Sequence, residues 1–139
     1  MSTFTEDFLL QLRAELARVL GLPAAAIYTG RAPQKVTRTG LEVWVKRLPM
    51  EPHPYLNVHL FEVHLRLRSR REENQTGADQ QDAVAVKLDD VRRHFDGTRP
   101  FVAALPSLVA VQVDPGTLDD DPDDPDLMDG TLVLRVLER

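Results

Sequence analysis

The chain has 139 residues, of which 42% are hydrophobic and 28% are charged, with a net charge of −5. This composition is typical of a globular protein of one domain, so we expect residues 1–139 to form a single domain with its own core. The absence of cysteine excludes disulfides, thiolate metal sites and thiol nucleophiles. No apolar run approaches the roughly 20 residues of a membrane span, and no secretory pattern is present, so synthesis in a cytoplasm is expected.

The first predicted element is an amphipathic helix. Thr3 and Glu6 have the spacing of a capping box, and apolar residues recur at helical intervals until Gly21. This pattern predicts a helix over Thr5–Leu20. A turn-rich stretch follows, and then alternating residues predict a strand over 41–46. Within that strand Trp44 lies in the polar phase, which leaves it either as a packing residue of the second face or as an interface anchor.

A second strand is predicted over Val58–Arg68. Its apolar alternation changes phase between Leu60 and Phe61. Because a period of two cannot change face without an extra residue, either a β-bulge lies there or the strand passes to another partner surface. The segment would extend roughly 35 Å, which is long for a small sheet, and we interpret the excess as a projecting hairpin arm.

The rest of the chain contains a second helix and two further strands. A polar loop is expected over 71–81, followed by a helix over Asp79–Phe95 and a short helical turn over 101–105. A strand over Leu108–Val113, a loop over 114–129 and a final strand over Thr131–Leu137 complete the expected order. The expected fold is therefore a single α+β domain of αββαββ order. Two hairpins would form a four-stranded, mainly antiparallel sheet with two helices packed on one face.

Charge is concentrated in the predicted loop. Residues 114–129 contain eight aspartates and neither Lys nor Arg, so the remaining residues carry a net charge of +3. Asp119, Asp121 and Asp123 match the first three ligand positions of an EF-hand loop. However, Asp124 occupies the position that requires glycine, and Gly130 occupies the position that requires glutamate. We therefore expect a solvated acidic loop and no metal site, and an ion- or ligand-binding module that uses this loop is the alternative function.

No other group of residues predicts chemistry. Glu62 and His64 share a strand face, but His59 has the opposite parity unless the bulge realigns it, and the three lack metalloprotease spacing. Ser69 and Ser107 have neither a glycine elbow nor a neighbouring base, and no glycine-rich phosphate loop is present. We accordingly expect no enzymatic activity and no cofactor.

The segment Ile27-Tyr28-Thr29-Gly30-Arg31-Ala32-Pro33-Gln34, which follows an N-terminal amphipathic helix, resembles the corresponding turn of the tail-completion, or tail terminator, proteins of long-tailed phages and gene transfer agents. The order of helices and strand pairs is similar to that family over nearly the full length. The resemblance implies a virion protein of the tail and neck, assembled in the host cytoplasm as a hexameric ring. Such a ring caps the tail tube, ends its polymerisation and joins the head connector, while DNA passes through the lumen without specific binding.

In such a ring, opposite charges on different sides of one subunit can attract each other head to tail. We expect a subunit interface that joins the basic strand face to the aspartates of the neighbour. The expected residues are Arg66, Arg68, Arg70 and Arg71 on one side and Asp119, Asp120, Asp121, Asp123 and Asp124 on the other. The basic face could also be merely solvated, and the loop could instead line the lumen and repel DNA.

Overall fold

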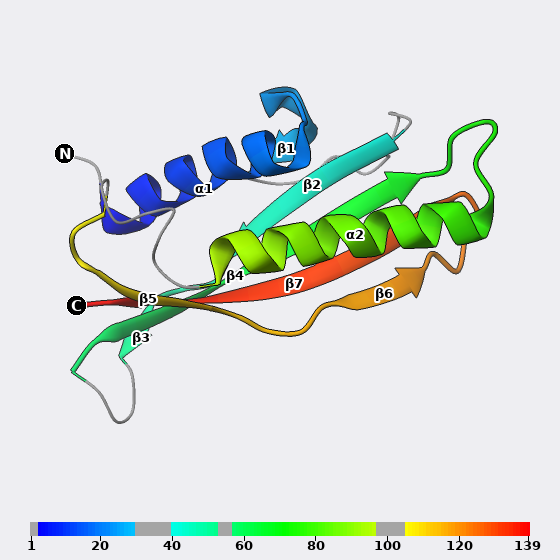
Figure 1. Ribbon diagram of the computed structural model, residues 1–139. Coiled ribbons are helices and arrows are strands. Elements are labelled where there is room, and N and C mark those ends of the chain that lie inside the picture. Colours follow the sequence, from blue (N-terminus) through cyan, green and yellow to red (C-terminus); the bar gives the residue numbers. More distant parts are fainter. Residues whose placement is uncertain (1–2, 30–39, 53–56, 97–104) are drawn as a thin grey trace.

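The computed structural model describes residues 3–29, 40–52, 57–96 and 105–139, and its two helices lie on one face of a long, twisted sheet (Figure 1). In chain order the elements are α1 (Phe4–Leu20), the 3-10 turn η1 (Ala24–Ala26), β1 (Ile27–Tyr28), β2 (Gly40–Arg47), β3 (Glu51–Pro52), β4 (His59–Arg70), α2 (Gly77–Phe95), β5 (Leu108–Val113), β6 (Thr117–Asp120) and β7 (Leu127–Glu138). No described helix is long and apolar enough to cross a membrane.

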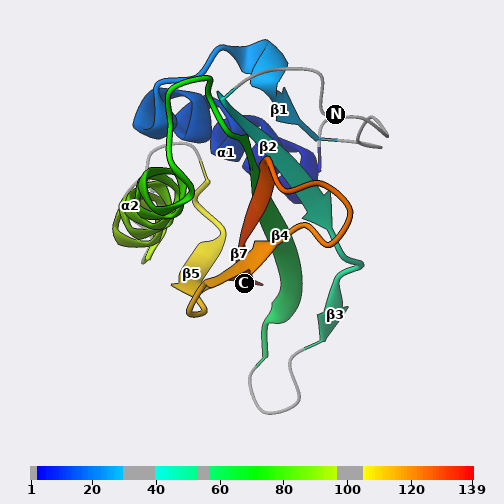
Figure 2. The same cartoon turned by 90° about the vertical axis from the view of Figure 1, so that its right-hand side faces the viewer.

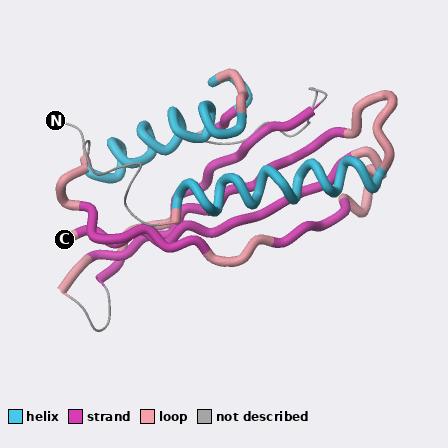
Figure 3. Tube along the Cα trace, viewed as in Figure 1, coloured by secondary structure: helices cyan, strands magenta, loops and turns pink. Residues whose placement is uncertain are grey.

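The expected four-stranded sheet and αββαββ order are wrong, because the sheet is mixed and has seven strands (Figure 3). The strand order is β1-β2-β4-β7-β5, with β3 also paired to β4 and β6 also paired to β7. Two causes explain the difference. Proline-containing breaks divide the strands beside β4 and β7 into short pieces, and β1 has only two residues, too few to produce an alternating pattern. The parallel pair of β1 and β2 makes the sheet mixed.

The two longest strands, β4 and β7, form the centre of the sheet. They pair antiparallel from His59↔Glu138 to Arg70↔Leu127 without interruption. The predicted bulge at Leu60 and Phe61 is therefore wrong, and the alternative holds, since β4 passes here from one partner to another: it pairs with β3 at His59 and Leu60 and with β2 from Val63 onward. Leu60 simply faces the other side of the sheet, opposite Leu137, where the helix-free face becomes apolar at its end. The apolar pattern changes phase because the environment changes along the strand, while the backbone continues regularly.

The predicted projecting arm is only partly correct. β4 is paired with β7 along its whole length, so it is not a free arm. Its first residues pair with β3, and this end of the sheet extends beyond the helices (Figure 2). The arginines of β4 lie at the opposite end of the strand.

The helices begin and end where their capping residues predict. Thr3 and Glu6 form the capping box of α1, and Gly21 ends it with a φ of 65°. Thr76 caps α2, which therefore begins at Gly77, inside the stretch expected to be a loop. Between the helices, Glu15 of α1 accepts hydrogen bonds from Arg18 and from His94 of α2, at 2.6 Å and 2.8 Å.

The core lies between the helices and the sheet face that they cover. Phe8 of α1 meets Phe61 of β4 edge to face, with 5.6 Å between the ring centroids. Helix α2 packs against β7 at Gly130, where an added Cβ would lie 2.8 Å from a methyl carbon of Leu88. A glycine at this position thus allows the helix and the central strand to pack closely.

The aspartate-rich block is part strand and part loop. Within 114–129 the structure contains β6 and the first residues of β7, so the predicted loop is reduced to residues 114–116 and 121–126. Asp119 and Asp129 lie opposite each other in the β6–β7 ladder, and the nearby Arg66 of β4 offsets the repulsion between these two carboxylates. The helical turn expected over 101–105 falls almost entirely on residues outside the described ranges.

Candidate functional site

The face of the sheet opposite the helices carries a dense group of charged residues. Cross-strand pairing aligns its residues in rows that run across β2, β4 and β7. One row contains Trp44, Arg66 and Thr131, and the next contains Glu42, Arg68 and Asp129. This alternation is the one that the sequence predicts for β4, with its arginines on the side that does not face the core.

Four arginines at the end of β4 pair with aspartates of the β6–β7 hairpin in the same chain, and we call these pairs the arginine ladder. Arg66 donates to Asp129 at 2.6 Å, Arg70 to Asp124 at 3.3 Å and Arg71 to Asp126 at 2.6 Å. Arg68 donates to Asp121, and its Nε lies 3.4 Å from Asp129 Oδ1.

The centre of the ladder is the least exposed part. The side chains of Arg68, Asp121 and Asp129 are 11%, 14% and 12% exposed, whereas those of Arg71 and Asp126 are 39% and 43% exposed. Ion pairs exposed to solvent contribute little, so the central pairs hold the hairpin more firmly than the outer one. Hydrogen bonds from the backbone N–H of Asp123 and of Asp124, together with the nearby Arg68 and Arg66 guanidinium groups, lower the pKa of Asp121 below its usual range.

Trp44 is part of the same face. The guanidinium carbons of Arg66 and Arg68 lie 4.9 Å and 5.4 Å from the centre of its ring. These cation–π contacts orient the two arginines toward the hairpin. Of the two roles that the sequence leaves open for Trp44, this geometry supports packing on the second face.

Buried beside Trp44 is the carboxylate of Glu42, which is 2% exposed. Tyr28 donates a hydrogen bond to one oxygen of this carboxylate at 3.4 Å. The other oxygen has no hydrogen-bond partner in the described parts of the chain.

The structure brings together most of the predicted interface residues, but it does so within one chain. The four arginines, Asp121 and Asp124 all belong to the ladder, and a contact of these groups with a neighbouring subunit stays a prediction. Asp119, Asp120 and Asp123 form no ion pair with any described residue. Asp126 and Asp129, which the interface prediction omits, supply ladder contacts; strand parity alone would have placed Asp129 on the arginine face.

Possible metal ligands are not clustered. Glu62 and His64 are 3.1 Å apart, but His59 lies at the strand end beside Glu138 and Pro52. No group of three or more His, Asp or Glu side chains in the described ranges is arranged to hold a metal ion. The oxygens of Asp121 already accept hydrogen bonds from Asp123 N, Asp124 N and Arg68.

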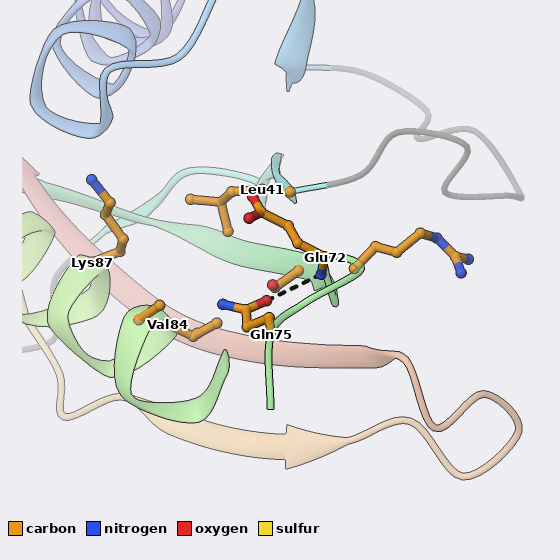
Figure 4. A pocket seen from close by; sticks show the side chains of 9 residues that line it. Leu41, Glu72, Gln75, Val84 and Lys87 are labelled. Carbon is orange, nitrogen blue, oxygen red and sulfur yellow. Dashed lines mark hydrogen bonds between the residues drawn. The ribbon is translucent and has the colours of Figure 1, made fainter. Parts of the chain in front are cut away.

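Three cavities have volumes of about 180, 270 and 340 Å³. The smallest lies between the ends of β2 and β4 and the start of α2, with Leu41 and Val84 on its walls and Glu72, Gln75 and Lys87 around them (Figure 4). Ser69 lines it as well, but no histidine lines any of the three cavities. None therefore pairs a serine with a histidine base.

No protein-family model matches the chain, and no curated protein matches its sequence. Among solved structures, the chain is similar to one from the virion of a native gene transfer agent particle. The TM-score is 0.50 and the identity 17%, over 94% of this chain and 90% of that chain. At this identity the likeness establishes a shared fold over nearly the full length.

Proposed function

We propose that this protein is a structural component of a phage or gene transfer agent particle, and that it forms a ring that completes the tail. In this role the ring, a hexamer, binds the end of the tail tube, stops the addition of tube subunits and provides the surface that joins the head connector. The observation that carries the proposal is the fold shared with a gene transfer agent virion chain over 94% of this chain. The resemblance of residues 27–34 to tail-completion proteins points to the same role.

The chemistry of the described surface is consistent with a structural role. Its densest charged group is the arginine ladder, in which each cation has a carboxylate partner within the same chain. Such a network stabilises a rigid surface and leaves few carboxylate oxygens for a metal ion. The same observation counts against the alternative of an ion-binding module, because Asp121, Asp124 and Asp126 already bind arginines.

The proposal is tested by deleting the gene for this protein from the genome that encodes the phage or gene transfer agent, and examining the resulting particles by electron microscopy. We expect tubes of irregular length and separate heads, because an uncapped tube end can add further subunits and has no surface for the head. Supplying the wild-type gene in trans is the control and should restore joined particles. Normal infectious particles from the deletion strain would refute a role in tail completion.

A second test uses purified components. Added protein should bind one end of isolated tail tubes and stop their elongation by fresh tube subunits. A heat-denatured sample serves as the control. Protein that binds along the side of tubes, or does not bind, would argue against a terminal cap.

A further inference from the structure

One edge of the sheet has no partner strand among the described residues. β5 pairs with β7 on one side, and none of the described strands pairs with its other side. Its sequence, Leu-Val-Ala-Val-Gln-Val, contains neither a charge nor a proline, and Val109 is 37% exposed. Soluble proteins usually protect edge strands with charges, prolines or a covering element. An edge of this kind is typical of one that becomes covered in an assembly.

The backbone of β5 is arranged to accept another strand. Asp114 N donates to Val133 O at 2.9 Å, which identifies the pair of these residues as hydrogen-bonded. Because hydrogen-bonded positions alternate in an antiparallel ladder, the N–H and C=O groups of Val111 and Val113 point away from β7, toward the free edge. The register shift between Leu108 and Ala110 limits the regular part of the edge to residues 110–113.

The opposite edge of the same sheet is basic. β1 covers β2 only at Val43 and Trp44, so no described strand lies beside the outer edge of Val45–Arg47. Lys46 and Arg47 are both exposed there. Neither forms an ion pair with another residue in the ranges that the structure describes.

The two edges match in register and in charge. Lys46 pairs with His64, and His64 pairs with Val133, whose carbonyl oxygen accepts the hydrogen bond from Asp114. Lys46 at one edge and Asp114 at the other therefore lie in the same row of the sheet, on its helix-free face. β2 and β5 run in opposite directions, so placing one sheet beside another would join them as an antiparallel pair.

We infer that a second copy of this chain binds at this edge: residues 45–47 of one copy pair with residues 113–115, at the end of β5, of the next, so that Lys46 lies opposite Asp114 and Arg47 opposite Val113. The contact joins different surfaces of two identical subunits, and its repetition closes a ring when the rotation from one subunit to the next divides a full turn. This inference rests on the proposed function, since it names the surface that builds the ring. The side chain of Asp114 is 39% exposed, and its carboxylate lies 3.1 Å from Arg135 of the same chain. In the assembly, Lys46 of the neighbour would bind this carboxylate together with Arg135 or in its place.

Reversing and exchanging the charges tests the contact. Lys46→Asp and Asp114→Lys should each weaken the association of copies by about two- to fivefold per interface, because a surface pair becomes a repulsion. The double variant, Lys46→Asp with Asp114→Lys, should restore association. Glu73→Lys, a charge reversal in the exposed turn before α2, is the matched control and should have no effect. Sedimentation over a range of protein concentrations measures association, and circular dichroism verifies folding.

Crosslinking gives a second readout that does not depend on affinity alone. Because the chain has no cysteine, Lys46→Cys with Asp114→Cys introduces the only thiols. Paired strands place opposite Cα atoms about 4.5 to 5.5 Å apart, within the range of a disulfide. Mild oxidation of concentrated protein should produce a ladder of multimers from the double variant and at most dimers from either single variant.

The outcomes separate the two proposals. Absence of multimers, together with no rescue in the charge exchange, overturns the edge contact. If such a protein still completes tails in the gene-deletion assay, the proposed function stands with another interface. Dimers from Asp114→Cys alone, as abundant as those of the double variant, would show that β5 pairs with β5 of another copy, and would also overturn the inference.

Discussion

Replacing Gly130 with alanine should destabilise the protein, although alanine is usually better tolerated than glycine in a strand. Gly130 lies in β7 under helix α2, and a Cβ added there would lie 2.8 Å from Leu88 Cδ1 and 2.9 Å from Val84 Cγ1. An ordinary contact begins at 3.4 Å, so these side chains must move by up to about 0.6 Å. Both are buried in the core, where neighbouring atoms restrict such movement.

Two opposing effects set the magnitude. Overpacking a core costs about 1 to 3 kcal/mol. Removing the backbone freedom of glycine gains about 0.5 to 1 kcal/mol. The central values of these two ranges give a net loss in the free energy of unfolding of about 1 kcal/mol, with overpacking as the larger effect.

Urea denaturation of Gly130→Ala measures this loss, and Gly77→Ala is the matched control. Gly77 is the first residue of α2, and a Cβ added there meets no atom within 4 Å. The same chemical change should therefore stabilise the protein at residue 77, by up to about 1 kcal/mol. Combining Gly130→Ala with Leu88→Ala should cost less than the two single losses added together. A Gly130→Ala variant as stable as the wild type would refute the close approach of α2 to β7.

Three further predictions concern charges and caps. Arg68→Ala should lower the free energy of unfolding by about 1 to 2 kcal/mol, because it leaves the largely buried Asp129 with one cation fewer. Arg71→Ala, at the exposed end of the ladder, should cost less than about 0.5 kcal/mol. Urea denaturation of the two variants compares these losses. Because the pKa of Asp121 is lowered in the folded protein, its carboxylate contributes its full stabilisation above the ordinary pKa of 3.8. This stabilisation is lost as the pH falls through the lower pKa of the folded state. The melting temperature of Asp121→Asn should therefore fall less steeply in acid than that of the wild type. Thr76→Ala, which removes the cap of α2, should cost about 1 kcal/mol in urea denaturation, and an unchanged midpoint would contradict the capping role.

Elements with a strong local pattern are predictable from this sequence. Both helices begin within two residues of the expected positions, and β5 has the predicted bounds, because caps and β-branched runs act over a few residues. The sheet was underestimated for the opposite reason. The two residues of β1 pair with β2 across a separation of 16 residues, and no local period reveals such a partner.

The charged site shows a similar limit. A run of aspartates without cations indicates a solvated loop when it is considered alone, but the cations lie on β4, more than 50 residues earlier in the chain. Strand alternation predicts that Arg66 and Arg68 share a face. Alternation along β7 likewise places Asp129 on the face away from the core, but only the pairing of β4 with β7 shows that it lies beside Arg68.

The position of β7 has a consequence for synthesis. It is the last of the described strands in chain order, yet β5 and β6 pair with it and with no other described strand, and β4 has it as its longest partner. A ribosome must therefore release Leu127–Glu138 before half of the sheet can form. We expect chains truncated before Leu127 to remain unfolded and to be degraded. Copies that lack β7 would then be unable to enter an assembly and block its growth. The topology therefore restricts assembly to subunits that contain β7.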